Sequence, residues 1–355
     1  MRKQDWCKYL MMCWSGIIIL TGNLHAQDPH YSQFYANPLY LSPSLAGSTD
    51  GARLVMNYRN QWPAVQKAFQ TYSVSFDNFF SSFNSGVGFY LMQDRAGSGG
   101  LTTTNAAFQY SYNLVLNDTW QIIPGIQFEV ANKFIDYNKL KLGYESSTGS
   151  GSGSQTRLVN DNINYFDLGA SAFLYSPKYW IGTTLNHLAQ PNYTFMNEEM
   201  KLPVKVTVFG GMNIWTLRSR KSSLNRSFSW SYRYQHQDKF KQFDIGMYWH
   251  NEPLELGIWY RGLPIFNNVE KTINQDALIV LLAYNYGPYR FGYSYDITVS
   301  GLGLKSAGAH EVSLIYEFNQ RLNLRLGGRR PALPCSKDAN PLDSRKYHKS
   351  KKSLF

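Results

Sequence analysis

The side chains best suited to catalysis or metal binding are few and scattered in this sequence. It holds seven His and three Cys residues, and no His, Cys, Asp or Glu cluster has metal-ligand spacing. His187 or His310 could join a nearby serine in a catalytic arrangement, but scattered serines produce such pairs by chance. Gly99-Gly100 and the run at 149–154 lack the strand and helix that flank a phosphate-binding loop. The sequence predicts a protein without enzymatic activity, cofactor or metal.

A second set of reactive side chains consists of arginines and acids that alternate with apolar residues. Between residues 290 and 296, Arg290 and Asp296 lie on one face of an extended chain, and Phe291 and Tyr293 lie on the other. Charge facing hydrocarbon costs about 2 to 4 kcal/mol for Arg or Lys near mid-bilayer, so in a membrane barrel this face must point into the lumen. The mixed signs predict pairing, either as a structural network or as a surface that grips a plug or cargo segment. The lumen candidates are Arg59, Arg233, Asp244, Arg261, Arg290, Asp296, Glu311 and Glu317.

The elements that carry these charges are expected to be strands. From residue 53 to 318, segments of about ten residues alternate apolar and polar positions between turn residues, as membrane barrel strands do. About fourteen such segments can be counted, an even number, as is usual for single-chain bacterial barrels. The fold class is therefore predicted to be all-β, a transmembrane antiparallel β-barrel.

Connection lengths alternate in the same region. The links at 176–178 and 251–253 are compact, whereas those at 137–163, 188–203 and 263–276 are long. Outer-membrane barrels have short periplasmic turns and longer external loops, so both termini should face the periplasm. A soluble β-sandwich binding module remains an alternative, but it does not require this parity.

Composition agrees with a strand-built membrane protein. Aromatic residues make up 16% and charged residues 17% of the chain. After the first two dozen positions there is no apolar run of about 18 residues, which a transmembrane helix would need. Any membrane crossing must therefore use strands.

The first 26 residues have the features of a secretory signal peptide. Arg2, Lys3 and Lys8 precede an apolar stretch at 10–20, and Ala26 supplies the small residue before a cleavage site. A retained N-terminal anchor is the alternative. Cleavage would leave residues 27–52 as an N-terminal periplasmic segment and Cys335 as the one remaining cysteine, so no intramolecular disulfide is expected.

The C-terminal segment, residues 319–355, carries most of the net charge of +11. It contains ten Lys or Arg residues against Asp338 and Asp343. A periplasmic location excludes nucleic acid as its partner, which leaves either a solvated tail or docking onto an acidic periplasmic protein or the cell wall. The docking candidates are Arg321, Arg325, Arg329, Arg330 and Lys346.

Six short motifs, in order along the chain, give a family resemblance. They are Gln27-Asp-Pro-His-Tyr-Ser-Gln-Phe34, Asn37-Pro38, Asn60-Gln-Trp-Pro63, His187-Leu188, Tyr293-Ser-Tyr-Asp296 and Gly308-Ala-His-Glu311. Over residues 27–318 the sequence resembles the PorP/SprF family of the Bacteroidota type IX secretion system. The segment after Phe318 has no residue-by-residue match to the family.

The resemblance implies an outer-membrane barrel that works with a periplasmic ring and motor. Such a barrel would secrete or retain large surface proteins, including gliding adhesins, and its lumen and external loops would receive the C-terminal domain of the cargo. A passive outer-membrane porin is the alternative function.

Overall fold

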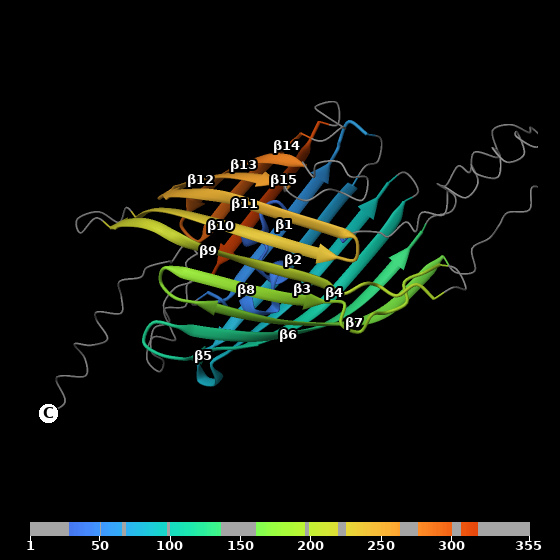
Figure 1. Cartoon of the computed structure of the whole chain (residues 1–355), viewed down its shortest axis with the longest axis horizontal. Coiled ribbons are helices and arrows are strands. Elements are labelled where there is room, and N and C mark those ends of the chain that lie inside the picture. Colours follow the sequence, from blue (N-terminus) through green and yellow to red (C-terminus); the bar gives the residue numbers. More distant parts are fainter. Residues whose placement is uncertain are drawn as a thin grey trace, which may run out of the picture.

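A closed antiparallel β-barrel is the main body of the protein, which we describe from a computed structural model (Figure 1). The structure describes residues 28–49, 51–65, 69–97, 100–135, 161–195, 199–218, 225–262, 276–299 and 307–318. The strands are β1 (Arg53–Gln61), β2 (Phe69–Phe80), β3 (Ser85–Ala96), β4 (Leu101–Tyr112), β5 (Leu114–Val115), β6 (Gln121–Phe134), β7 (Asn162–Tyr175), β8 (Tyr179–Asn186), β9 (Lys205–Arg218), β10 (Asn225–Gln237), β11 (Phe240–Asn251), β12 (Leu254–Arg261), β13 (Ala277–Tyr286), β14 (Tyr289–Thr298) and β15 (Ala309–Glu317).

Strand pairing closes the barrel and confirms the predicted strand number. The first strand, β1, pairs with both β2 and the last strand, β15. β5 is a two-residue extension that follows β4 in the chain, and both pair with β6, so the wall has 14 strands. Closure gives each wall strand two hydrogen-bonded neighbours, which an all-strand structure needs in a bilayer because lipid cannot satisfy backbone groups.

Side chains alternate between the two faces of this wall. In β13, Leu278, Val280 and Leu282 point outward and are 38–48% exposed, whereas Ile279 and Leu281 point inward and are 1% exposed. The outer face of the barrel is thus an apolar surface suited to lipid. No helix of the described residues is long and apolar enough to cross a membrane.

The two ends of the barrel differ in their connections. The links from β6 to β7, β8 to β9 and β12 to β13 lie at one end, which we call the long-loop end. The links from β7 to β8, β11 to β12 and β13 to β14 lie at the other, which we call the short-turn end. β1 begins and β15 finishes at the short-turn end.

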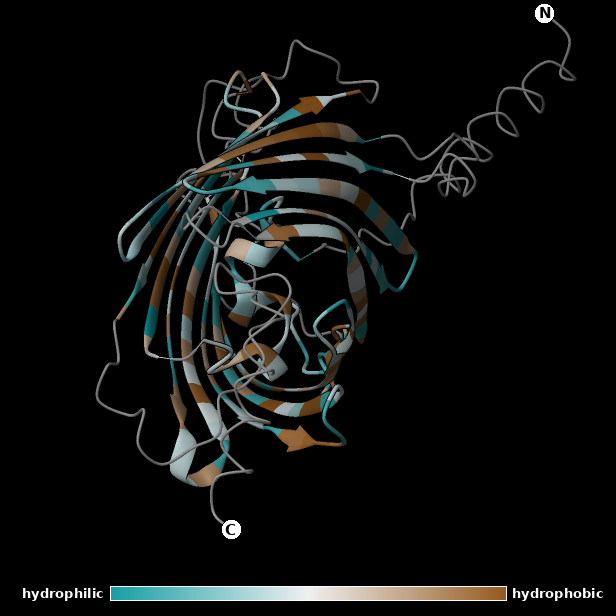
Figure 2. Cartoon of the chain, turned by 90° about the vertical axis from the view of Figure 1, so that its left-hand side faces the viewer, coloured by the Kyte–Doolittle hydropathy of each residue, from teal (hydrophilic) through white to brown (hydrophobic). Residues whose placement is uncertain are grey.

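Residues 28–49 form a plug inside the barrel, whereas the sequence predicted a periplasmic segment over residues 27–52. The plug contains three single-turn helices, η2 (Phe34–Ala36), α2 (Pro38–Leu41) and η3 (Pro43–Leu45), which Figure 2 shows within the ring of strands. It runs through the lumen, because Asp28 contacts Lys205 at the long-loop end and Gly47 contacts Asp77 near the short-turn end.

Apolar residues of the plug explain its position. Phe34 and Leu39 are each 1% exposed, and Phe34 packs edge-on against Trp259 of the wall with ring centroids 4.8 Å apart. Burying such side chains is worth roughly 1.5 to 3 kcal/mol each, which a solvated periplasmic segment would forgo.

The predicted signal peptide, residues 1–26, and the predicted basic tail, residues 319–355, lie outside the described residues. The tail candidates Arg321, Arg325, Arg329, Arg330 and Lys346 therefore remain predictions.

Candidate functional site

Ser32 and Gln33 of the plug are held by acids of the wall. The backbone N–H of Ser32 donates to Glu311 at 2.7 Å, and the N–H of Gln33 donates to the other oxygen of that carboxylate at 3.1 Å. The Ser32 hydroxyl donates to Asp296 at 2.6 Å. Two neighbouring strands, β14 and β15, thus supply acceptors for a segment more than 250 residues earlier in the chain.

Two arginines complete this contact from other strands. Arg59 on β1 lies 2.9 Å from Asp296 and 3.2 Å from Glu311, and it donates to the Ser32 hydroxyl at 2.8 Å. Arg261 on β12 donates to the same hydroxyl at 2.7 Å and to Asp296 at 3.1 Å. All four charged side chains are at most 3% exposed, so each depends on its partners for the stabilisation that water would otherwise give.

A third arginine, Arg233 on β10, extends the network. It donates to Asp244 through two nitrogens and to the carbonyl of Tyr31 at 3.1 Å. Its guanidinium carbon lies 4.3 Å from the centre of the Phe34 ring, a cation–π contact with the plug. Asp244 also lies 3.4 Å from Arg261, which joins the two parts of the network.

Two of the predicted lumen residues lie apart from this network, toward the short-turn end. Arg290 donates to Glu255 of the wall at 2.9 Å. Glu317 ends β15, opposite Arg53 in register. The structure brings together the other six predicted residues, Arg59, Arg233, Asp244, Arg261, Asp296 and Glu311.

Glycines of the wall leave the space that the plug occupies. A Cβ added to Gly86 or Gly125 would lie 2.6 Å from a backbone carbon of Ala46 or Pro43, respectively. A Cβ at Gly292 would lie 2.6 Å from the side-chain oxygen of Gln33. The wall and plug therefore fit through positions where no side chain is tolerated without movement.

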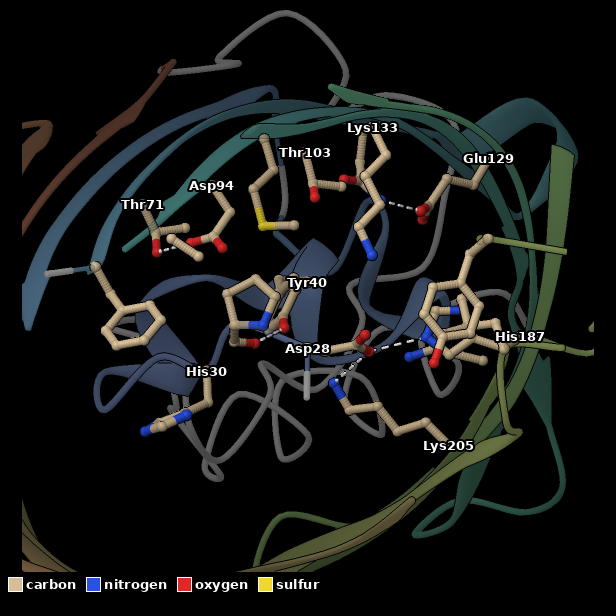
Figure 3. Close-up of a pocket in the computed structure, with 18 of the residues that line it drawn as sticks. Asp28, His30, Tyr40, Thr71, Asp94, Thr103, Glu129, Lys133, His187 and Lys205 are labelled. Atoms are coloured by element: carbon tan, nitrogen blue, oxygen red, sulfur yellow. Dashed lines mark hydrogen bonds and ion pairs between the residues drawn. The ribbon is translucent and has the colours of Figure 1, made fainter. Parts of the chain in front are cut away.

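The start of the plug is held by a second charged cluster, at the long-loop end (Figure 3). The two ring nitrogens of His187 lie 2.8 Å from Asp28 and 2.6 Å from Asp167, and Lys205 lies 3.2 Å from Asp28. Burial alone would lower the pKa of His187, but the two carboxylates raise it to about 10. Burial alone would raise the pKa of Asp28, but His187 and Lys205 hold it well below its usual range.

The contacts of His187 and His310 can now be compared with the catalytic arrangement that the sequence left open. Both ring nitrogens of His187 face carboxylates, so the protonated ring donates twice and has no free lone pair to act as a base. His310 instead bonds the hydroxyl of Tyr293 at an exposed position. Among the described residues, no group of three or more His, Cys, Asp or Glu is placed to hold a metal.

Next to this cluster is a cavity of about 480 Å³ between the plug and the wall at the long-loop end. Asp28, His30 and Tyr40 of the plug line it, together with Lys133 and Glu129 of β6 (Figure 3). The plug thus fills the lumen toward the short-turn end and leaves this cavity at the long-loop end.

Several of the motifs that carry the family resemblance meet at the plug. The N–H of Trp62 donates to the carbonyl of Gly308 at 2.7 Å, which places two motifs side by side where β1 pairs with β15. Asn37 of the plug donates to Ser73 at 3.2 Å. The six charged residues of the network form what we call the plug seat: Arg59, Arg233, Asp244, Arg261, Asp296 and Glu311. The sequence by itself did not predict that residues 28–49 bind there. A signal was available in the apolar residues of 31–45, which are unusual for a solvated segment.

Fold and site together define a membrane-type β-barrel whose lumen is filled by its own N-terminal segment. Comparison with known families matches residues 23–316 to the type IX secretion system membrane protein PorP/SprF. The chain belongs to this family, which is a family of secretion-system membrane proteins and not of enzymes. A barrel of this family fits the outer membrane.

Three solved structures that resemble the barrel are distant in sequence. KdgM porin is 10% identical, with a TM-score of 0.36 over 75% of this chain and 99% of that one. The P. putida toluene transporter TodX is 9% identical, with a TM-score of 0.41 over 79% of this chain and 93% of that one. A mutant of Rh. blastica porin is 7% identical, with a TM-score of 0.34 over 75% and 98%. No curated protein matches the sequence.

Proposed function

We propose that this barrel secretes large surface proteins or attaches them to the cell, coupled to the periplasmic ring and motor of the type IX system. Gliding adhesins are one class of such cargo, and the cargo's C-terminal domain would meet the long-loop end of the barrel. The family membership supports a place in the secretion system.

The observation that carries this proposal is the plug. It contacts strands all around the wall, from Ser73 on β2 and Ser171 on β7 to Arg233 on β10 and Glu311 on β15. A buried charge network that holds a peptide across the lumen is suited to a gated or docking component. A passive porin, by contrast, needs a continuous aqueous path.

A gene deletion tests this function in cells. We expect the deletion strain to lose specific large proteins from its surface, and the intact gene to restore them. A pull-down of the barrel from native outer membranes should recover the same surface protein. Unchanged surface proteins in the deletion strain, together with large, steady currents from purified protein in planar bilayers, would support the porin instead.

The basic tail offers a second test. Truncation after Phe318 should leave the barrel assembled, as judged by heat-modifiable migration, but reduce its co-purification with the periplasmic ring. If co-purification is unchanged, the tail is a solvated extension and not a docking element.

A further inference from the structure

The plug crosses the lumen with its amino end at the long-loop end of the barrel. Asp28 contacts His187 there, whereas Gly47 contacts Asp77 near the short-turn end, where β1 begins. The chain before Asp28 is therefore connected to the plug at the end of the barrel that is expected to face the outside of the cell.

This direction is incompatible with a signal peptide that stays in the inner membrane. If the apolar stretch at 10–20 remained there, it would tether the chain on the periplasmic side, where the short turns are expected. The tethered chain would then have to run through the lumen beside the plug to reach Asp28. Plug residues such as Phe34 and Leu45 are at most 2% exposed and fill that space. Seating of the plug therefore requires that residues 1–26 are removed first.

The amino end of the plug opens onto the long-loop cavity. Figure 3 shows Asp28 within it, with Asp94 of β3 and Glu129 of β6 on the wall to either side. Consecutive Cα atoms are about 3.8 Å apart, so a chain that begins at Gln27 brings its amino group to this space. The covalent link to Asp28, and not the lining alone, thus selects what enters the cavity.

The charges around the cavity are short of one cation. The described residues supply four carboxylates and three cations, which are Asp28, Asp94, Glu129 and Asp167 against Lys133, His187 and Lys205. Arg59 also lines the cavity, but it belongs to the plug seat, where three arginines and three acids balance. His30 remains neutral, because burial lowers its pKa well below the usual range and Arg261 and Arg59 lower it further. One negative charge is left over, whichever carboxylate Lys133 faces.

The carboxylates of Asp94 and Glu129 accept only from neutral groups among the described residues. Asp94 accepts from the Thr71 hydroxyl at 2.6 Å, and Glu129 accepts from the amides of Asn105 and Gln127. A carboxylate has about four acceptor positions, so these hydrogen bonds leave capacity for another donor. An ammonium group beside either carboxylate would form a charge-assisted hydrogen bond, which is roughly twice as strong as a neutral one.

Hydrolysis of the peptide bond between Ala26 and Gln27 supplies such an ammonium group. Water adds its hydroxyl to the carbonyl carbon of Ala26 and a hydrogen to the nitrogen of Gln27, and the bond between these two atoms breaks. The new α-amino group takes up a proton near neutral pH, because its ordinary pKa is about 8. Ala26 is the small residue that this kind of cleavage requires.

We propose that cleavage after Ala26 precedes seating of the plug, and that the α-ammonium group of Gln27 then occupies the long-loop cavity beside Glu129 and Asp94. The chain's own terminus thus holds the amino end of the plug, together with the contacts of Asp28. This inference is independent of the cargo that the barrel secretes.

Two measurements on the mature protein in detergent test the position of the amino group. The intact mass should be that of a chain that begins at Gln27 and keeps its free amine. At pH 7 an amine reagent should label this α-amine at least about tenfold more slowly in the folded protein than in urea, because a pKa raised by one unit lowers the fraction of free amine about tenfold. A chain that begins elsewhere, a mass lower by one ammonia from a cyclised Gln27, or equal labelling rates overturns the proposal.

Variants identify the carboxylates. Glu129→Gln combined with Asp94→Asn should raise the labelling rate of the folded protein about tenfold, with heat-modifiable migration as the check that the barrel is assembled. Glu255→Gln is the matched control and should leave the rate unchanged, because Glu255 is paired with Arg290 toward the short-turn end. An unchanged rate in the double variant, or the same increase in the control, contradicts the assignment.

A cross-link between plug and wall tests the order of events in cells. The backbone N–H of Ser44 donates to Ser171 of β7 at 2.9 Å, and the two hydroxyls are also hydrogen-bonded. Cysteines at these two positions, in a chain whose three native cysteines are replaced by serine, should therefore form a disulfide when the plug is seated.

This cross-link is compared in two variants of the cleavage site. Ala26→Gly keeps a small residue there and should retain the cross-link, whereas the uncleaved Ala26→Leu chain should lose it. An uncleaved chain that cross-links as fully as the cleaved one overturns the proposed order. The mass and labelling measurements use the cleaved protein, so they decide the proposal even where Ala26→Leu does not assemble.

Discussion

The plug seat and the long-loop cavity lie in the same lumen, yet their charges are organised in opposite ways. In the seat, Arg59, Arg261, Asp296 and Glu311 compensate one another and bind Ser32. In the cavity, Lys133 has only aromatic neighbours among its described contacts. The charges of the seat compensate one another, whereas among the described residues of the cavity Lys133 has no carboxylate partner and Asp94 and Glu129 have no cationic partner.

This difference separates charges that compensate one another from charges that have only neutral neighbours. A buried ion pair contributes little net stability, but removing one partner is costly because the other charge is left buried. Substitutions in the seat should therefore lower the free energy of unfolding much more than substitutions at Lys133. The following predictions test that division, from the largest effect to the smallest.

Glu311→Leu should give the largest loss of stability. It leaves Arg59 and the N–H groups of Ser32 and Gln33 without their carboxylate, and breaking a buried pair costs about 3 to 5 kcal/mol. Urea unfolding followed by heat-modifiable migration measures the loss. Tyr260→Phe, on the alternate face of β12, is the control and should change little. Similar losses of unfolding free energy in the two variants would contradict the structural role of the Glu311 ion pair.

Gly125→Ala should displace the plug at a smaller cost. The new Cβ meets the backbone of Pro43 and Ser44, and overpacking of this kind costs roughly 1 to 3 kcal/mol. We expect larger and more frequent currents in planar bilayers than for the unmodified protein. The control is Gly169→Ala, whose Cβ would have 3.1 Å to its nearest atom, a side-chain oxygen. Equal currents in the two variants would show that the plug does not limit conduction.

The ion pair between His187 and Asp28 should weaken as the pH rises. The pKa of His187 is raised from 6.5 to about 10, so its contribution to stability is complete below pH 6.5 and lost as the pH rises through 10. Asp28 has a lowered pKa, so its charge stays constant over this range.

The difference in unfolding free energy between the unmodified protein and His187→Gln measures this contribution. It should be largest near pH 6, decline between pH 6.5 and 10, and vanish above pH 10. A difference that is independent of pH would mean that His187 does not carry a stabilising charge.

Lys133→Met should have the smallest effect on stability. The variant loses a cation–π contact but leaves no carboxylate of the described residues unpaired, so we expect a change within about 1 kcal/mol. Arg233→Met, which leaves Asp244 with one fewer partner, is the matched comparison in the seat and should be clearly less stable in the same urea titration. If Lys133→Met were as destabilising as Arg233→Met, Lys133 would belong to the structural network.

The wall of the barrel could be predicted from the sequence because its pattern is local. Alternation places Arg290 and Asp296 on one face and Phe291 and Tyr293 on the other wherever the strand lies, since side chains of a strand point to opposite sides in turn. The strand number and the lumen-facing residues could be predicted from this alternation, which repeats every two residues. The partner of each charge did not, because pairing depends on strands far apart in the chain.

The contents of the lumen were decided only in three dimensions. By itself the sequence determined an all-β barrel, its inward charges and its family. The tertiary structure decided that residues 28–49 fold into the barrel, that Ser32 meets Arg59, Arg261, Asp296 and Glu311, and that Lys133 is left facing a cavity. These contacts join residues up to 279 positions apart, and no local period encodes which side chains a closed lumen will bring together.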